Sequence, residues 1–223
     1  AVMPAQFLPL AEEIGLIIPI GRWVLETACA QNMAWQREGL PPLRVAVNLS
    51  AVQFNDHHLV AHIESVLAKT GMPPHLLELE ITETAAVTEI EQALDTLGTL
   101  RNLGIRISID DFGTGLSSMS YLRDLPIDQL KIDRAFVARL GQNVDHGNAI
   151  VRSFIDLAHS LKLDVVAEGV ETIAQQRYLT LAGCDELQGY LLDKPMPASE
   201  YETRLSREGE ALKRDLSIWG LSY

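Results

Sequence analysis

The sequence predicts an α/β fold in which six strands alternate with helices, as in most of a (β/α)8 barrel. From residue 43 onward, short runs rich in Val, Ile and Leu alternate with helical patterns. Each run has the composition of a parallel strand that is buried on both faces. A polar residue also appears where each run ends. A barrel gathers the carboxyl ends of its strands at one mouth, so these polar residues would share a site.

The order of the elements follows from these patterns. Strands are expected at Leu43–Leu49, Leu76–Thr82, Ile105–Asp110, Asp128–Ile132, Leu163–Ala167 and Glu186–Tyr190. Helices outside the alternation are expected at Pro4–Glu13, Pro19–Glu38 and Ser199–Lys213. Gly71, Gly104 and Gly183 stand where a left-handed cap would end a helix. We expect a single domain over residues 1–223, because no low-complexity linker or fixed-period repeat interrupts the chain.

Composition narrows the class of protein. The chain is 47% apolar and 22% charged, which is typical of a domain with a sizeable core. A formal net charge of −12 gives no basic surface for a long nucleic acid, so a ligand that carries phosphate would need metal ions. No apolar run approaches the roughly 20 residues of a membrane span, and the first residues lack a secretory signal pattern. We therefore expect a cytoplasmic location.

Polar residues end each expected strand, at positions where a buried parallel sheet would otherwise be apolar. They are Asn48, Glu80, Asp110, Asp111, Lys131, Asp133, Glu168 and Gln188. Taken singly, each could cap a helix or lie in a solvated loop. Periodicity does not separate an open doubly wound sheet from a barrel, but only a barrel would bring all of these side chains together. Several carboxylates at one mouth would repel one another, and bound cations would relieve that repulsion.

The residue types at this mouth indicate the metal and the reaction. Asp, Glu and Asn offer oxygen ligands, without thiolate or imidazole, which suits Mg²⁺ or Mn²⁺ better than Zn²⁺. The adjacent Asp110 and Asp111 could serve two ions. Two ions about 4 Å apart activate a water and stabilise both oxygens of an in-line phosphoryl displacement. The residues therefore predict phosphodiester hydrolysis, and at this point a different phosphoester substrate stays open.

The segment Asp110–Ser118 places two glycines and two hydroxyls directly after the acidic pair. A mobile loop over a ligand would have this composition. The alternative is an ordinary loop in which Ser117 or Ser118 caps the next helix. The acidic pair beside it favours the first interpretation.

Six segments, in the same order, resemble the EAL domains of cyclic di-GMP signalling proteins. They are Val47–Ser50 (VNLS), Glu78–Glu83 (ELEITE), Asp110–Gly115 (DDFGTG), Leu130–Asp133 (LKID), Ala167–Glu171 (AEGVE) and Gln188–Tyr190 (QGY). The resemblance covers nearly the whole chain. It implies a TIM-like (β/α)8 barrel with one antiparallel strand, and hydrolysis of cyclic di-GMP to linear pGpG with two Mg²⁺ or Mn²⁺ ions.

The resemblance also implies roles for the site residues. Asn48, Glu80 and Asp110 resemble the ligands of one metal. Asp110, Asp111 and Glu168 resemble the ligands of the other, so that Asp110 would bridge the two. Lys131 is similar to the lysine that orients the attacking water and offsets charge on the phosphate, and Glu168 would help to polarise that water.

Four further residues have roles by resemblance. Glu83 is similar to a residue that anchors the loop from Phe112 to Ser118, and Asp133, Glu171 and Gln188 are candidates for contacts with the ligand. The family resemblance also implies a homodimer and upstream sensory or diguanylate cyclase-like domains. The alternative function is that of a catalytically inactive receptor for cyclic di-GMP, although every matched catalytic position holds the expected residue.

The chain departs from the family pattern at its start. The Glu-Ala-Leu signature is absent, and only six of the eight barrel strands are found. The chain opens at Met3–Phe7, which resembles the family just after that signature. An unclosed barrel would expose strand edges and core surface, so we expect that the native protein contains upstream residues with the first two strands. They would supply another metal-binding glutamate and an arginine for the ligand.

Overall fold

The computed structural model describes residues 4–88, 90–114, 121–141 and 145–206. Its strands are β1 (Val45–Leu49), β2 (Leu77–Thr82), β3 (Arg106–Phe112), β4 (Gln129–Ile132), β5 (Asp164–Ala167) and β6 (Glu186–Leu187). Its α-helices are α1 (Pro4–Glu13), α2 (Ile17–Arg37), α3 (Ala51–Phe54), α4 (Leu59–Thr70), α5 (Glu83–Thr88), α6 (Ile90–Asn102), α7 (Arg134–Val137), α8 (Asp145–Ser160) and α9 (Ile173–Ala182). Two short 3₁₀ helices are η1 (Pro74–Leu76) and η2 (Tyr121–Arg123).

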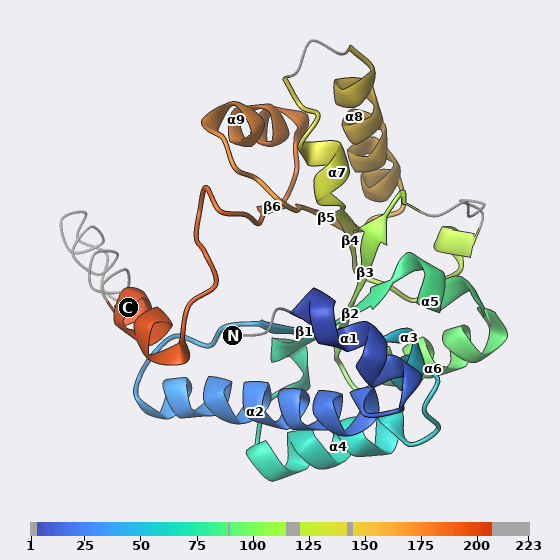
Figure 1. The fold of residues 1–223 in the computed structure, drawn as a ribbon, viewed down its shortest axis with the longest axis vertical. Helices are drawn as coiled ribbons and strands as arrows, with labels where there is room; N and C mark the ends of the chain where they lie inside the picture. Colours follow the sequence, from blue (N-terminus) through green and yellow to red (C-terminus); the bar gives the residue numbers. More distant parts are fainter. Residues whose placement is uncertain (1–3, 89, 115–120, 142–144, 207–223) are drawn as a thin grey trace.

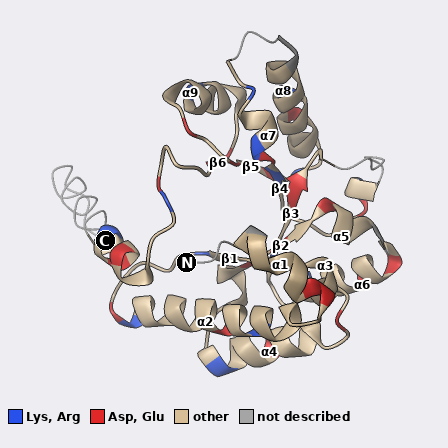
Figure 2. Ribbon diagram, viewed as in Figure 1, with Lys and Arg blue, Asp and Glu red and all other residues tan. Residues whose placement is uncertain are grey.

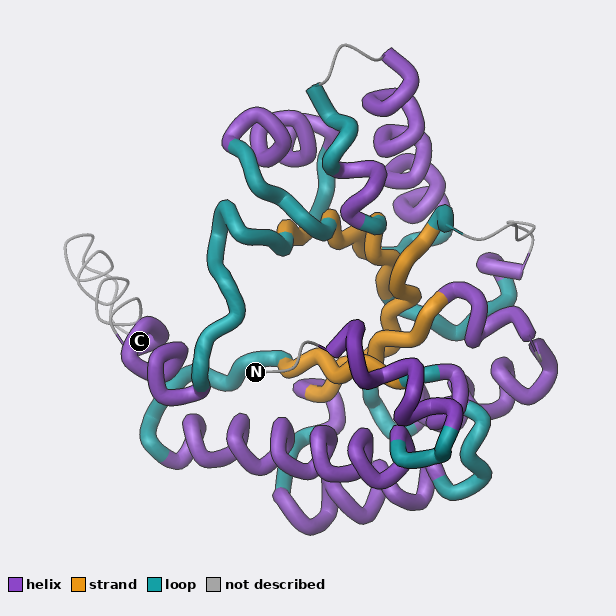
Figure 3. Tube along the Cα trace, in the orientation of Figure 1, coloured by secondary structure: helices purple, strands orange, loops and turns teal. Residues whose placement is uncertain are grey.

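The six strands form one sheet in chain order, β1-β2-β3-β4-β5-β6, and every neighbouring pair is parallel. The sheet curls, with helices on its outer side, as Figures 1 and 3 show. This confirms the predicted TIM-like barrel in partial form, with six strands where a complete barrel has eight. The antiparallel strand that the resemblance implies is not among the strands that the structure describes.

The alternation along each strand sorts side chains between two faces of the sheet. Leu77, Leu79 and Ile81 of β2 are buried and belong to the main hydrophobic core. Their neighbours Glu78 and Glu80 point the other way and line the inner side of the curl. Since the helices cover the apolar face, the inner face is left to polar groups.

Most element boundaries agree with the sequence prediction, and the largest difference is at the last strand. Strand β6 ends at Leu187, although the pattern predicted a strand to Tyr190. Gly189 explains the difference, because a Cβ on it would lie only 2.2 Å from the carbonyl oxygen of Val170. The chain turns at this close approach, and the amide of Leu191 then donates to the same carbonyl.

The remaining predicted elements are placed as follows. Helix α1 has the predicted bounds, and α2 begins at Ile17, two residues before the predicted start. Residues 198–206 are helical, and the rest of the predicted helix 199–213 lies outside the described residues. Gly71 and Gly183 form left-handed caps, as predicted, with φ of 73° and 85°. In the part of the chain that the structure describes, no helix is long and apolar enough to cross a membrane.

Candidate active site

The inner face of the sheet carries polar residues in rows that run across neighbouring strands. Asn48 of β1 pairs in register with Glu80 of β2, and Glu80 pairs with Ser108 of β3. Lys131 lies near the end of β4, and Glu168 directly follows β5. The parallel strands thus bring residues from five segments to one end of the sheet, as the sequence predicted.

Lys131 is the centre of this cluster. Its side chain is buried, and its Nζ lies 2.7 Å from Oε1 of Glu80, 2.6 Å from Oε1 of Glu168 and 3.4 Å from Oδ1 of Asp110. Burial alone would lower the pKa of Lys131, but the charges of Glu80 and Asp110 and the hydrogen bonds with Glu168 and Glu80 outweigh it. The pKa of Lys131 is held above its ordinary value, so the side chain is a permanent cation.

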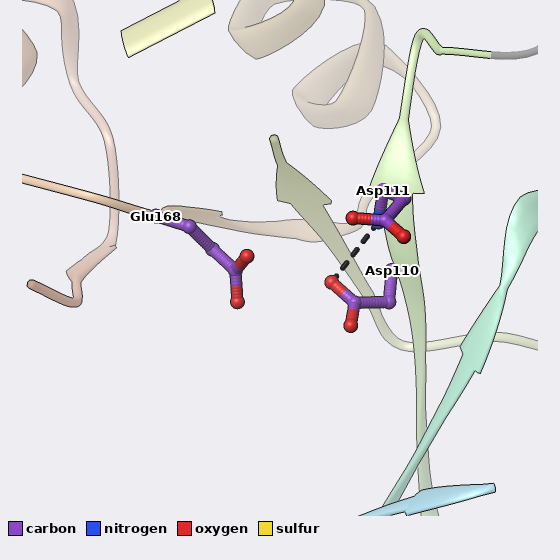
Figure 4. A group of neighbouring side chains, drawn as sticks. All are labelled: Asp110, Asp111 and Glu168. Carbon is purple, nitrogen blue, oxygen red and sulfur yellow. Dashed lines mark hydrogen bonds between the residues drawn. The ribbon is translucent and has the colours of Figure 1, made fainter. Parts of the chain in front are cut away.

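The adjacent Asp110 and Asp111 serve one site because the backbone departs from regular strand geometry between them. In a regular strand, consecutive side chains point to opposite faces. Here the register between β3 and β4 shifts between Ile109 and Phe112, and Asp111 has a φ of 55°, which is uncommon for a residue other than glycine. The amide of Asp111 donates to Oδ1 of Asp110 at 3.0 Å (Figure 4). Backbone strain of this kind is concentrated at functional sites.

Asp110, Asp111 and Glu168 together have the arrangement of a cation site. One carboxylate oxygen from each lies within 4.8 Å of the other two, and Figure 4 shows Glu168 opposite the two aspartates. All three offer hard oxygen ligands, which fit Mg²⁺ or Mn²⁺. Among the described residues the cluster also has too few positive charges, since Lys131 contacts three acidic residues, Glu80, Asp110 and Glu168, and Asp111 and Asp133 add two more beside them. Divalent cations therefore fit both the ligand type and the charge of this site.

Burial and neighbouring negative charges raise the pKa values of two carboxyl groups in the cluster. Burial raises the pKa of Glu168, and the charges of Asp110 and Glu80 add to this rise while Lys131 opposes it. Burial also raises the pKa of Asp111, and the charges of Asp110 and Asp133 add to it. Crowded carboxylates with raised pKa values are typical of sites that bind cations or perform chemistry. Figure 2 shows acidic positions where the chain leaves β3 and β5.

Other predicted site residues lie at the rim of the cluster. Asn48 is exposed. Asp133 caps α7 by accepting from the amide of Ala135 at 2.9 Å, and it also interacts with Asp111. Asp133 therefore caps α7 and also lies beside the acidic cluster.

Glu171 lies four residues after the end of β5 and Gln188 directly follows β6, and both are exposed. The amide of Glu171 donates to Oε1 of Gln175, which belongs to the N-terminal cap of α9. Gln188 lines a cavity of about 600 Å³ on the inner side of the sheet, together with Glu80 and Lys131. This position suits a contact with a ligand in that cavity.

Glu83 joins the two ends of the loop that follows β3. It is buried, and its Oε2 accepts from the amide of Gly113 at 3.1 Å while its Oε1 accepts from the hydroxyl of Tyr121 at 2.7 Å. Residues 115–118 of the predicted mobile loop, Asp110–Ser118, lie outside the described residues. These contacts fit the anchoring role that the resemblance implies for Glu83.

Sequence reasoning missed two groups of inner-face residues. Ser108 and Gln129 are fully buried beneath the cluster, and Arg44 and Glu78 belong to ion pairs at the opposite end of the strands. The alternation of side chains along a strand could have identified Ser108 and Gln129, because Ser108 is two residues before Asp110 and Gln129 is two residues before Lys131. Residues at this spacing in a strand share a face.

Comparison with known proteins places the chain in a family. The sequence profile described as "EAL domain" matches residues 1–195. MucR of Pseudomonas aeruginosa, a bifunctional diguanylate cyclase/cyclic di-GMP phosphodiesterase, is 48% identical over 199 residues, which cover 89% of this chain and 29% of MucR. The cyclic di-GMP phosphodiesterase PdeR of Escherichia coli is 38% identical over 201 residues, which cover 90% of this chain and 30% of PdeR.

A solved structure supports the same assignment. The structure of the PaMucR phosphodiesterase in complex with c-di-GMP matches with a TM-score of 0.86 and 47% identity, over 90% of this chain and 81% of that one. The chain spans less than a third of the length of the two curated relatives. The profile match, the sequence identity and the fold agree, and the chain belongs to the EAL domain family.

Proposed function

We propose that this chain is a metal-dependent phosphodiesterase domain that hydrolyses cyclic di-GMP to linear pGpG. The observation that carries the proposal is the group formed by Asp110, Asp111 and Glu168 beside the buried cation Lys131. The names of the relatives supply the substrate, since MucR and PdeR are cyclic di-GMP phosphodiesterases and the PaMucR structure contains c-di-GMP. The domain would act in bacterial second-messenger signalling.

In this proposal the carboxyl end of the sheet holds two Mg²⁺ or Mn²⁺ ions. Asn48, Glu80 and Asp110 would ligate one ion, and Asp110, Asp111 and Glu168 would ligate the other. When bound, the ions supply activation of a water and stabilisation of charge on the phosphate oxygens. The register shift at β3 supports this assignment, because it lets consecutive aspartates serve the same centre.

Lys131 would hold a fixed positive charge beside the scissile phosphate and orient the attacking water. Its three carboxylate contacts keep it protonated and in place, so no reorganisation is required as charge develops. Glu168 would accept a hydrogen bond from the same water. Asp133, Glu171 and Gln188 would contact the ligand at the rim, and Glu83 would hold the loop that begins at Gly113.

The wider setting belongs to the same proposal. The relatives are more than three times as long as the matched region, which fits a domain that works beside sensory or diguanylate cyclase-like modules. We place this domain in the cytoplasm as a homodimer, because its substrate is an intracellular messenger and the family resemblance implies dimers.

The proposal is tested by a chromatographic assay for conversion of cyclic di-GMP to pGpG with Mg²⁺ or Mn²⁺. The assay is run on this chain and on the full-length protein, and ligand binding is recorded alongside. Metal-dependent formation of pGpG supports the enzyme, and its loss in Asp110→Asn assigns the chemistry to this cluster. Binding without turnover in both proteins would contradict the proposal and identify a receptor.

A further inference from the structure

Ser108 and Gln129 form a hydrogen-bonded pair beneath the acidic cluster. Ser108 is 0% exposed and Gln129 is 1% exposed. The hydroxyl of Ser108 donates to Oε1 of Gln129 at 3.2 Å. The other end of the amide, Nε2 of Gln129, is buried and has no hydrogen-bond partner in the described structure. Gln129 lines the same cavity of about 600 Å³ as Glu80 and Lys131.

The position of this pair follows from the path of the Glu80 side chain. Glu80 lies on β2 and Lys131 on β4, with β3 between them, yet their charged atoms are 2.7 Å apart. Ser108 is the residue of β3 in register with Glu80, and Gln129 is the residue of β4 in register with Ser108. The carboxylate of Glu80 therefore crosses β3 over the small side chain of Ser108, and Gln129 lies directly beneath its contact with Lys131.

An orphaned amide in this position indicates a missing acceptor. A buried N–H group without a partner costs free energy, so native structures pair such groups with protein atoms or ordered water. The cavity is polar and much larger than one water requires. Among the acidic groups that line it, Glu186 is paired with Arg44, and Glu78 faces Arg44 and Arg106 although its Oε2 makes no hydrogen bond to the described residues. Glu80 lies in the same row as Gln129, because Ser108 is in register with both. Glu80 has one oxygen on Lys131, and a carboxylate offers about four acceptor positions.

We propose that Gln129 is a positioning residue for the metal site, whose Nε2 donates through one buried water to the carboxylate of Glu80. The hydroxyl of Ser108 fixes the orientation of the amide by donating to its oxygen. Gln129 and Lys131 would then hold the two oxygens of Glu80 in different directions, which leaves the remaining acceptor positions aimed at the mouth. The role rests on the proposed function, in which Glu80 is a metal ligand.

The test is Mn²⁺ affinity, measured by calorimetric titration of the full-length protein and of three variants. Gln129→Met keeps the size of the side chain and removes the donor. We expect it to weaken Mn²⁺ binding about 10- to 100-fold, which is typical for the loss of a hydrogen bond to a metal ligand. The metal-free melting temperature should fall only slightly, because the lost hydrogen bonds to Ser108 and the water are partly offset by removal of a buried amide.

Two further variants separate positioning from packing. Leu130→Met changes a buried neighbour on the opposite face of β4, so it should leave Mn²⁺ affinity unchanged. Ser108→Ala removes the hydrogen bond that orients the amide, and a loss of a few-fold is expected, smaller than that of Gln129→Met. Ser108→Ala also tests the positioning role of Gln129 if Gln129→Met does not fold.

The outcomes distinguish this proposal from the function on which it rests. If the wild type and Gln129→Met bind Mn²⁺ with equal affinity, the metal site stands and the positioning role is wrong. If the wild type does not bind Mn²⁺, the proposed function loses its metal site and the positioning role falls with it. A crystal structure with a water between Nε2 of Gln129 and Glu80, absent from Gln129→Met, would support the role without any measurement of turnover.

Discussion

The two ends of the sheet differ in the balance of their positive and negative side chains. At the amino end, Glu78 lies between Arg44 and Arg106, and the two arginines also pair with Glu186 and Asp164. Positive and negative groups alternate there, and the buried carboxylate of Glu78 faces two arginines. An end of this kind needs no ligand to be stable.

At the carboxyl end, in the part of the chain that the structure describes, Lys131 is the one cation in contact with the acidic cluster. Lys131 contacts Glu80, Asp110 and Glu168, and Asp111 adds a further carboxylate within reach of two of them. Burial and mutual repulsion raise the pKa values of Glu168 and Asp111. Balanced charge thus marks the end of the sheet that supports the fold, and unbalanced negative charge marks the end proposed to bind metal and ligand.

The largest expected effect comes from removing one charge at the carboxyl end. Asp110→Asn keeps the shape of the side chain but weakens both proposed metal sites, so hydrolysis of cyclic di-GMP should fall by ~10²–10³-fold. Its metal-free melting temperature should not fall, because one repulsive charge leaves the cluster. The matched control is Asp164→Asn at the amino end, which should retain turnover. Equal loss in both variants would contradict the division between the two ends.

Removal of the single cation should affect both activity and folding. Lys131→Met leaves buried carboxylates without a partner, and we expect the free energy of unfolding at neutral pH to fall by about 3–5 kcal/mol. The loss should shrink as the pH is lowered, because the carboxylates then take up protons. Added Mn²⁺ should also restore stability. Denaturant unfolding at two pH values, with and without Mn²⁺, measures this, and a loss that is independent of pH would argue against repulsion as the cause.

At the amino end, the same kind of change should affect stability alone. Arg106→Met removes one of the two cations beside Glu78, and the free energy of unfolding should fall by about 3 kcal/mol. Burial already raises the pKa of Glu78, and the loss of Arg106 would raise it further. The destabilisation should therefore be greatest at neutral pH and decrease as the pH falls through the raised pKa. A change in the turnover number of the folded variant would show that the amino end also takes part in catalysis.

The smallest effect concerns Cys184, which lies just before β6 at the amino end. Burial raises the pKa of its thiol to about 11. Since the thiolate is the reactive form, alkylation at pH 8 should be ~100-fold slower in the folded protein than in the unfolded chain, whose thiol pKa is about 8.5. The rate, measured with iodoacetamide, should rise with pH up to that value. Fast alkylation at pH 8 would indicate that this end of the sheet is open to solvent.

Local patterns in the sequence predicted much of the fold. The apolar runs located all six strands, because strands buried on both faces need Val, Ile and Leu at nearly every position. The barrel prediction then placed Glu80, Asp110 and Lys131 at one mouth, and the structure brings both carboxylates into contact with Lys131. Both steps depend on short-range patterns and on one general rule of topology.

The remaining features depend on contacts between distant segments. The sequence of β3 does not reveal the register shift that turns Asp111 into the site, because it arises from pairing with β4. The reach of Glu80 across β3 depends on the small size of Ser108 and on the curl of the sheet. The early end of β6 depends on the approach of Gly189 to Val170. None of these leaves a periodic signal in the chain.

Titration of the protein with Mn²⁺ in a calorimeter shows whether the carboxyl end of the sheet is a site for divalent cations. We expect saturable binding of two ions to the wild type. In the double variant Asp110→Asn, Asp111→Asn, we expect that binding to be lost while the fold is retained. Unchanged binding in the double variant, or no binding by the wild type, would show that this end of the sheet is not a metal site.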